Sequence, residues 1–192
     1  MFALSGYLEE NAKEAADNRS KIYYRLLADV WRRGWGGGRA GPGRQLGQAD
    51  FDRLFEAMAL AAWHGGDERV ATYDRFERAL IIMKAKEIFE DFTKTEGGDV
   101  SNLAVNFYLK QADTASKGVE FTHTSFGEYL ASRAIFRVAD DVVKLVDIRE
   151  EIALEEWLKG VSTGKLTYEL LAFIRDEARL RVEKFPKSCH RD

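Results

Sequence analysis

Few side chains of this 192-residue chain stand in patterns that catalyse reactions or bind metals. The three histidines, His64, His123 and His190, lie far apart, and none has a serine in a glycine elbow beside it. The single cysteine, Cys189, provides neither zinc-ligand spacing nor a partner for an internal disulfide. We therefore expect no self-contained catalytic or metal site, and we expect a reducing, cytoplasmic environment.

The sequence GVSTGKL at residues 160–166 comes nearest to a phosphate-binding loop. Such a loop needs G-x-x-x-x-G-K-[ST], because glycine amides wrap the phosphates, the lysine reaches the outer ones and the hydroxyl holds magnesium. Here the segment is one residue too short and ends in Leu166. We interpret it as a turn between helices, so the chain has no P-loop and is not itself an enzyme. Asp140 and Asp141 resemble a magnesium site, but their helical setting favours solvated charges.

The overall composition gives no general attraction to nucleic acid. The chain is 45% hydrophobic and 32% charged, with a formal net charge of -3, which is ordinary for a folded soluble protein. The glycine-rich stretch 34–44 carries arginines near Trp31 and Trp35, and we favour a solvated linker over a single-strand binding site. Neither a signal peptide nor a run of 18 uncharged apolar residues is evident, so we expect no export and no membrane span.

Helical periodicity dominates the first half of the chain. Apolar residues at helical spacing predict a helix over 19–33 and a second helix that starts at Asp50 and stops at Gly65. Thr72 can cap a third helical region over 73–95, in which the apolar face shifts near Ile81. Two short helices therefore fit this region better than one long helix.

A change of pattern marks the second half. Short β-branched and aromatic runs within 103–123 predict a β-hairpin. Three helices should follow the hairpin: one of about twenty residues from a capping box of Ser125 and Glu128, one capped by Asp147 and stopped by Gly160, and one capped by Thr167. The predicted fold class is mainly α with a small β-hairpin.

Residues 119–135, VEFTHTSFGEYLASRAI, place His123 between a strand and a helix. There it would lie beside unpaired backbone amides and the positive end of the helix dipole, where a phosphate binds well. The stretch resembles the F-x-H-x-S-F-x-E-Y-x-A-A signature of the winged-helix domain in NACHT-family proteins, which include bacterial signal-transduction ATPases and animal NOD-like receptors. The matching residues are Phe121, His123, Ser125, Phe126, Glu128, Tyr129 and Ala131. Gly127 replaces the common glutamine, and Ser132 the second alanine.

Two further segments extend the resemblance along the chain. Residues 18–33 are similar to the N-R-x-x-L-Y-x-x-L-L helix that opens this region in bacterial members, and residues 154–177 are similar to the helices after the winged helix. The resemblance implies a remnant of a preceding helical region at 1–17, a winged-helix-like domain at 18–146 and a helical segment at 147–192. The P-loop ATPase core would precede the first of these.

The resemblance also implies a function. In the family the motif histidine contacts the β-phosphate of ADP and holds the winged helix over the nucleotide in the resting state. The resemblance assigns this contact to His123. The supporting motif residues are Phe121, Ser125, Phe126, Glu128 and Tyr129. The isolated chain would hold no cofactor, since ADP or ATP with Mg belongs to the parent protein. Its partner would be the P-loop core in cis or in trans, with oligomerisation through the parent. Neither membrane nor nucleic acid is expected as a partner.

Three alternatives stay open. From the residues alone, His123 is better explained as satisfying a backbone partner at the junction. A free-standing winged-helix DNA-binding protein would use the helix after Thr72, but its acidic neighbours and the acidic chain count against that. The basic residues concerned are Arg75, Arg78, Lys84 and Lys86. The third alternative is an adaptor fragment that docks on a full-length relative.

Overall fold

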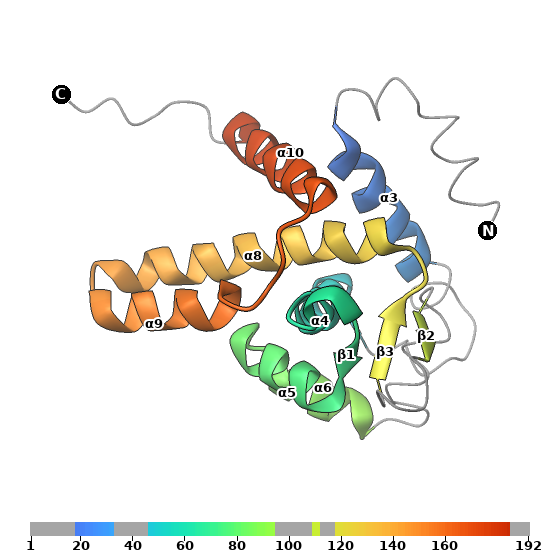
Figure 1. Ribbon diagram of the computed structural model, residues 1–192, viewed down its shortest axis with the longest axis horizontal. Helices are drawn as coiled ribbons and strands as arrows, with labels where there is room; N and C mark the ends of the chain where they lie inside the picture. Colours follow the sequence, from blue (N-terminus) through green and yellow to red (C-terminus); the bar gives the residue numbers. More distant parts are fainter. Residues whose placement is uncertain (1–17, 33–45, 95–108, 112–117, 185–192) are drawn as a thin grey trace.

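A computed structural model describes residues 18–32, 46–94, 109–111 and 118–184 of the chain (Figure 1). Helices make up most of these residues and a small antiparallel sheet is the only other regular structure among them, which confirms the mainly α class. The described elements, in chain order, are α3 (Arg19–Trp31), α4 (Gln48–Trp63), the short 3₁₀ helix η3 (Gly66–Glu68), β1 (Ala71–Thr72), α5 (Tyr73–Ile82), α6 (Lys86–Thr93), β2 (Leu109–Gln111), β3 (Gly118–Phe121), α8 (Thr124–Val146), α9 (Glu150–Val161) and α10 (Tyr168–Lys184).

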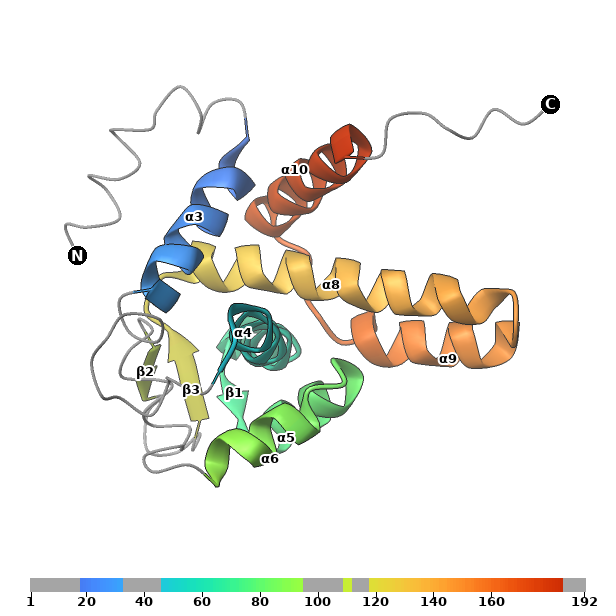
Figure 2. The same cartoon turned by 180° about the vertical axis from the view of Figure 1, so that it is seen from behind.

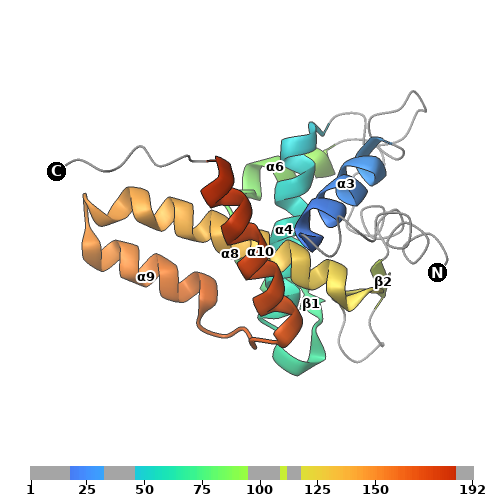
Figure 3. The ribbon, with the colours of Figure 1, turned by 90° about the horizontal axis from the view of Figure 1, so that it is seen from above.

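The long helix α8 organises the structure. Figures 1 and 2, which show opposite sides, place α3 and α10 on one side of it and α4 on the other, with α5 and α6 beyond α4 and the sheet beside α4 near the start of α8. Helix α9 returns along the second half of α8, and α10 crosses α8 beside α3 (Figure 3). Apolar residues three or four apart give α8 a buried face. They are Phe126, Tyr129, Leu130, Ala134 and Val138.

Helix α4 forms the centre of the core. It is buried on nearly all sides because α3, α5, α8 and the sheet surround it, so most of its residues are apolar, and its two buried acids, Asp52 and Glu56, pair with arginines of α8. Phe51, Leu54, Phe55 and Leu60 are almost completely buried. Each such side chain contributes about 1.5–3 kcal/mol of hydrophobic stabilisation. This packing fixes α4 against the start of α8.

The three strands pair in the order β1-β3-β2, all antiparallel. The predicted hairpin is confirmed by β2 and β3, in which Leu109 lies opposite Phe121; residues 103–108 and 112–117 lie outside the described residues. The third strand, β1, was not predicted, because two residues are too short to show alternation. Gly118 makes the pairing of β1 with β3 close: a Cβ there would lie 2.5 Å from Val70 Cγ1.

The helix predictions of the first half are confirmed with small shifts. Helix α3 lies within the predicted 19–33, and α4 starts at Gln48, two residues before Asp50. The predicted break near Ile81 separates α5 from α6. Thr72 caps α5 as predicted, since its hydroxyl accepts a hydrogen bond from the Arg75 amide at 3.4 Å.

The predicted capping box is wrong. Helix α8 starts at Thr124, so its N-cap is His123, and Ser125 is already inside the helix. Glu128 does not turn back to the helix start because tertiary partners use its carboxylate. It accepts a hydrogen bond from the Thr167 hydroxyl at 2.7 Å and pairs with Arg69 at 3.1 Å.

Of the predictions for the two following helices, one is wrong and one is confirmed. Asp147 is the C-cap of α8, and α9 is capped by Arg149 and continues past Gly160 to Val161, so the predicted bounds of this helix are wrong. The prediction for α10 is confirmed, because the Thr167 hydroxyl accepts from the Leu170 amide at 3.1 Å. A cap is thus correctly predicted where its hydroxyl meets the local backbone.

Several predictions fall on residues outside the described ranges. These are the remnant at 1–17, the glycine-rich stretch 34–44, and the C-terminal residues with Cys189 and His190. Within the described ranges, none of the helices combines the length and the apolar character needed to cross a bilayer.

Candidate functional site at the start of α8

His123 lies where the sequence predicts it, between a strand and a helix. Strand β3 ends at Phe121, α8 begins at Thr124, and His123 is the half-buried N-cap in extended conformation. Its carbonyl accepts hydrogen bonds from the amides of Phe126 at 3.0 Å and Gly127 at 3.4 Å. The backbone of His123 therefore begins the helix, and its imidazole is carried at the positive end of a 23-residue helix dipole.

Aromatic packing fixes this junction. The ring centroid of Phe126 lies 6.4 Å from that of Phe121 and 6.0 Å from that of Tyr23 on α3. Tyr23 also contacts Tyr129 at 5.3 Å and Phe173 of α10 at 5.0 Å. Three of the motif residues thus build the core that joins α3, α8 and α10. They pack the start of α8 against α3 and α10.

Ser125 and Tyr23 add a polar contact to this packing. Their side chains share a hydrogen bond, and burial raises the pKa of the Tyr23 phenol. Gly127 fits the same arrangement closely, because a Cβ there would lie 2.9 Å from the Phe121 ring. A glutamine at this position, common in the resembled signature, would require Phe121 to move.

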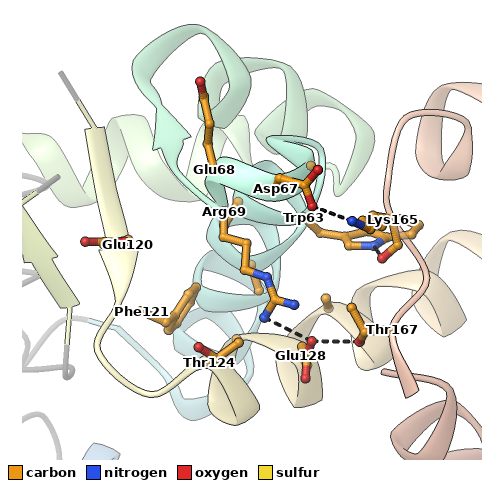
Figure 4. A pocket seen from close by; sticks show the side chains of 15 residues that line it. Trp63, Asp67, Glu68, Arg69, Glu120, Phe121, Thr124, Glu128, Lys165 and Thr167 are labelled. Atoms are coloured by element: carbon orange, nitrogen blue, oxygen red, sulfur yellow. Dashed lines mark hydrogen bonds and ion pairs between the residues drawn. The ribbon is translucent and has the colours of Figure 1, made fainter. Parts of the chain in front are cut away.

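Glu128 connects three segments that are distant in sequence (Figure 4). Its carboxylate is buried, pairs with Arg69 and accepts from Thr167, the N-cap of α10. Arg69 has a φ of 51°, an unusual left-handed conformation for a residue with a Cβ. Such conformations persist where surrounding contacts enforce them. Glu128 is therefore one contact that holds the 66–69 turn and the start of α10 against α8.

A cavity of about 230 Å³ opens beside Glu128. Its walls include the rings of Trp63 and Phe121, and small residues such as Gly127 and Ala131 form part of its lining. His123 is not among the lining residues. Figure 4 shows the Asp67–Lys165 pair at its edge.

The connection between α9 and α10 covers one side of this cavity. The Trp63 indole donates to the Lys165 carbonyl at 2.8 Å, and Lys165 Nζ lies 2.5 Å from Asp67 Oδ1. The hydrogen bond from Lys165 lowers the pKa of the Asp67 carboxyl. Gly164 lies directly on Trp63, since a Cβ there would be 1.9 Å from the ring. The interpretation of GVSTGKL as part of a turn between helices is confirmed, because Gly160 and Val161 end α9 and the rest lies in the connection.

The charges around the cavity do not favour an anion. Four carboxylates, those of Asp67, Glu68, Glu120 and Glu128, line it together with only two bases, Arg69 and Lys165. A phosphate bound here would meet more negative than positive charge. If the start of α8 receives a phosphate, it does so at the His123 end of the helix rather than in this cavity.

A buried group of charges on α4 and α8 was missed by the sequence analysis. Arg133 pairs with Asp52 at 3.1 Å and with Glu56 at 2.9 Å, and Arg137 pairs with Glu56 at 2.6 Å. Two carboxylates one turn apart on α4 thus meet two arginines one turn apart on α8. The matching spacing was a usable signal, but nothing in the sequence says that these two helices are neighbours.

Burial governs the titration of this charge group. It raises the pKa of the Asp52 carboxyl, although Arg133 acts in the opposite direction. Burial also acts to lower the pKa of the Arg133 guanidinium, but the nearby carboxylates of Glu56 and Asp52 outweigh it and raise that pKa. Arg133 is therefore firmly charged, and it is the cation on which the two carboxylates depend.

The four cations of the DNA-binding alternative all have partners within the protein. Arg75 and Arg78 donate to the carbonyls of Val70 and Asp74, both at 3.2 Å. Lys84 pairs with Asp141 at 2.9 Å and Lys86 lies 3.9 Å from Glu90. Asp140 and Asp141 are helix charges as predicted, and both are held in ion pairs.

Comparison with known proteins identifies no relative: no family model, curated protein or solved structure matches the chain. Among the described residues, no group of three or more His, Cys, Asp or Glu side chains is placed to hold a metal ion.

Proposed function

We propose that this chain is the regulatory winged-helix module of a NACHT-type signal-transduction NTPase, which senses bound ADP and controls the switch from a closed to an open state. The order of elements supports the winged helix. Helix α4 is followed by β1, the pair α5 and α6, and the hairpin β2-β3, whose second strand pairs with β1. A helix-turn-helix followed by a β-hairpin wing has this arrangement.

The observation that carries the proposal is the position of His123 within the resembled motif. It is the N-cap of α8, and the aromatic residues of the same motif fix that helix in the core. A helix N-terminus presents backbone amides and a positive dipole to an anion. An imidazole at this point is suited to donate a hydrogen bond to a phosphate that arrives from a neighbouring domain.

The proposed mechanism is a contact made only in the resting state. The P-loop core, in cis or in trans, binds ADP, or ATP with Mg, and supplies the catalytic groups. His123 donates to the β-phosphate of ADP, and this bond holds the module over the nucleotide. Exchange for ATP breaks the contact, and the released module permits oligomerisation through the parent protein. A ligand shifts a conformational equilibrium only by the difference between its affinities for the two states. A charged hydrogen bond that exists in the closed state alone gives ADP that difference.

The geometry is less favourable to a free-standing DNA-binding protein. In a helix-turn-helix the second helix enters the major groove, and here that helix is α6. Its sequence, KEIFEDFT, carries the base Lys86 against three acids, Glu87, Glu90 and Asp91. Such a helix would be repelled by phosphates. This repulsion comes from α6 itself and does not depend on the net charge of the chain.

The decisive experiment replaces His123 by alanine in the chain combined with its P-loop core. Loss of a hydrogen bond to a charged group costs about 1.5–3 kcal/mol, so ADP should bind roughly ten- to hundredfold more weakly. ATP affinity should change less, because the contact belongs to the resting state. Equilibrium binding of fluorescent ADP and ATP measures both. Activation should become leakier rather than disappear.

The matched control is Thr122→Ala, the exposed neighbour of His123. It should leave ADP affinity unchanged. If instead His123→Ala unfolds the domain while ADP affinity per folded molecule stays the same, then His123 is a structural residue and the proposal is wrong.

A further inference from the structure

A second depression lies between α3, α8 and α10. It is an open groove of about 850 Å³, and Figure 3 shows the three helices that enclose it. Its α8 residues include Arg133, Arg137 and Lys144, whereas Thr124, Glu128 and Ala131 line the cavity. With 3.6 residues per turn these two sets lie on opposite faces of the helix. The groove also contains no His123, so it is separate from the start of α8.

The groove is rich in cations. Three acidic residues, Glu56, Asp140 and Glu177, line it together with twice as many bases. Those bases come from all three helices, and they are Lys21, Arg25, Arg133, Arg137, Lys144 and Arg181. The whole chain has a net charge of -3, so this is a local concentration of positive charge and not a general property of the surface.

Carboxylates in and beside the groove pair with several of these cations: Asp140 pairs with Arg181 at 2.7 Å, and Asp141, just outside the lining, pairs with Lys144 at 3.0 Å. Glu56 is completely buried and is neutralised by Arg133 and Arg137. Burial raises the pKa of the Glu177 carboxyl, although Arg133 acts against it, and this weakens its negative charge. Lys144 and Lys84 share the single carboxylate of Asp141, so one positive charge in excess remains beside the open part of the groove, where the Lys144 side chain is 73% exposed.

Arg137 is the residue best placed to contact a ligand. Its Nε donates to Glu56 at 2.6 Å, and among the described residues this is its only hydrogen bond. A guanidinium has five N–H donors, so the terminal amino groups can still donate in a fork. That fork matches the oxygens of a phosphate. Its side chain is 31% exposed, which leaves it reachable from the groove.

We propose that this groove binds a ligand with two or more phosphate groups. Its volume lies in the range of about 300–1,000 Å³ typical of small-ligand sites. The bases lie along α8 and α3 at spacings of one to two helical turns, roughly 6–10 Å, which suits several linked anionic groups. Exposed Tyr24 also lines the groove and offers a ring beside the phosphates. The source is either a free polyphosphate or nucleotide, or the backbone of a single-stranded nucleic acid.

Calorimetric titration of the full chain tests the proposal with three probes: sodium tripolyphosphate, ATP and a single-stranded oligonucleotide. All three should bind at low salt, and their dissociation constants should rise as salt is added. Equal affinity for tripolyphosphate and ATP assigns the groove to free phosphate groups. Tighter ATP binding that is lost in Tyr24→Ser assigns it to nucleotides, and tightest binding of the oligonucleotide assigns it to nucleic acid.

Substitutions then locate the site. Arg25→Gln and Lys144→Gln should each weaken tripolyphosphate binding by about three- to tenfold, since each removes one exposed cation. Arg137→Lys keeps a charge beside Glu56 but removes the fork, and it should weaken binding at least as much while thermal melting reports an intact fold. The control is Lys159→Gln, an exposed lysine of α9 outside the groove, which should change nothing.

Three outcomes would overturn the assignment: no binding of any probe at low salt, equal weakening by Lys159→Gln, or a polyglutamate peptide that binds as tightly as tripolyphosphate. His123→Ala should leave groove binding unaltered. The groove and the proposed ADP contact can therefore fail independently of each other.

Discussion

The two faces of α8 carry charges that are held in different ways. On the face toward the cavity, the partner of Glu128 is Arg69, whose side chain is 40% exposed, and the pair of Asp67 and Lys165 lies at the surface. On the face toward the groove, Glu56 has an exposed fraction of 0% and meets two arginines. The ion pairs of one face thus have at least one exposed partner, whereas those of the other face belong to a buried charge group.

This difference determines how strongly the ion pairs of each face stabilise the fold. A solvated ion pair contributes little, so its segment can move away at small cost. Removing one partner of a buried pair leaves an uncompensated charge, so the segments it joins stay together. We infer that the contact between α4 and α8 contributes more to stability than the exposed Asp67–Lys165 pair of the connection between α9 and α10. Three predictions test this contrast.

The largest effect is expected from Arg133→Met. It keeps much of the side-chain volume but leaves Asp52 and Glu56 buried with one cation between them, which should cost about 3–5 kcal/mol of the free energy of unfolding. Urea denaturation monitored by circular dichroism measures it. Lys165→Met, on the other face, is the control and should hardly move the midpoint. Similar losses in both variants would remove the distinction between the faces.

A smaller effect is expected from Gly164→Val. Its Cβ would lie 1.9–2.2 Å from atoms of the Trp63 ring, so the connection must move away from α4. Overpacking of this kind costs about 1–3 kcal/mol. The indole N–H resonance of Trp63 should shift, because its hydrogen bond to Lys165 is lost. The exposed Ser162→Ala should leave that resonance in place. An unshifted resonance in Gly164→Val would contradict this displacement of the connection.

The smallest effect is the pH dependence of stability, to which His64 and Glu177 contribute with opposite signs. Burial lowers the pKa of His64, whose Nε2 lies 2.9 Å from the Gly160 carbonyl. The unfolded chain therefore takes up this proton first, and stability falls as the pH drops below about 6.5. Burial raises the pKa of Glu177, so the folded chain holds that proton longer, and stability falls as the pH rises above about 4.5.

Melting temperatures of two variants separate these contributions. His64→Gln should lose less stability than the wild type between pH 7 and 5, in a window set by the lowered histidine pKa. Glu177→Gln should flatten the profile just above the ordinary glutamate pKa. If both variants follow the wild-type profile throughout, burial is not the cause of either shift.

The sequence was a good guide to local structure. Periodic apolar residues identified α3, α4 and the break between α5 and α6, because a helical stripe is written into neighbouring positions. It also identified His123 at a strand-to-helix junction, since both flanking patterns are short-range. The caps were less predictable. The predicted cap Thr167 is confirmed, but Glu128 binds partners distant in the sequence instead of capping its own helix.

What the sequence alone determined is therefore the set of helices, the hairpin and some of the residues at their junctions, among them Thr72, His123 and Thr167. Only the tertiary structure decided which faces meet: that Asp52 finds Arg133 across 81 positions, and that Thr167 reaches Glu128 across 39. Hydrophobic burial is non-directional, so an apolar face must be covered, but its sequence does not determine which element covers it. The pairing of charges, the cavity and the groove all depend on that choice, so they emerge only when the helices are packed.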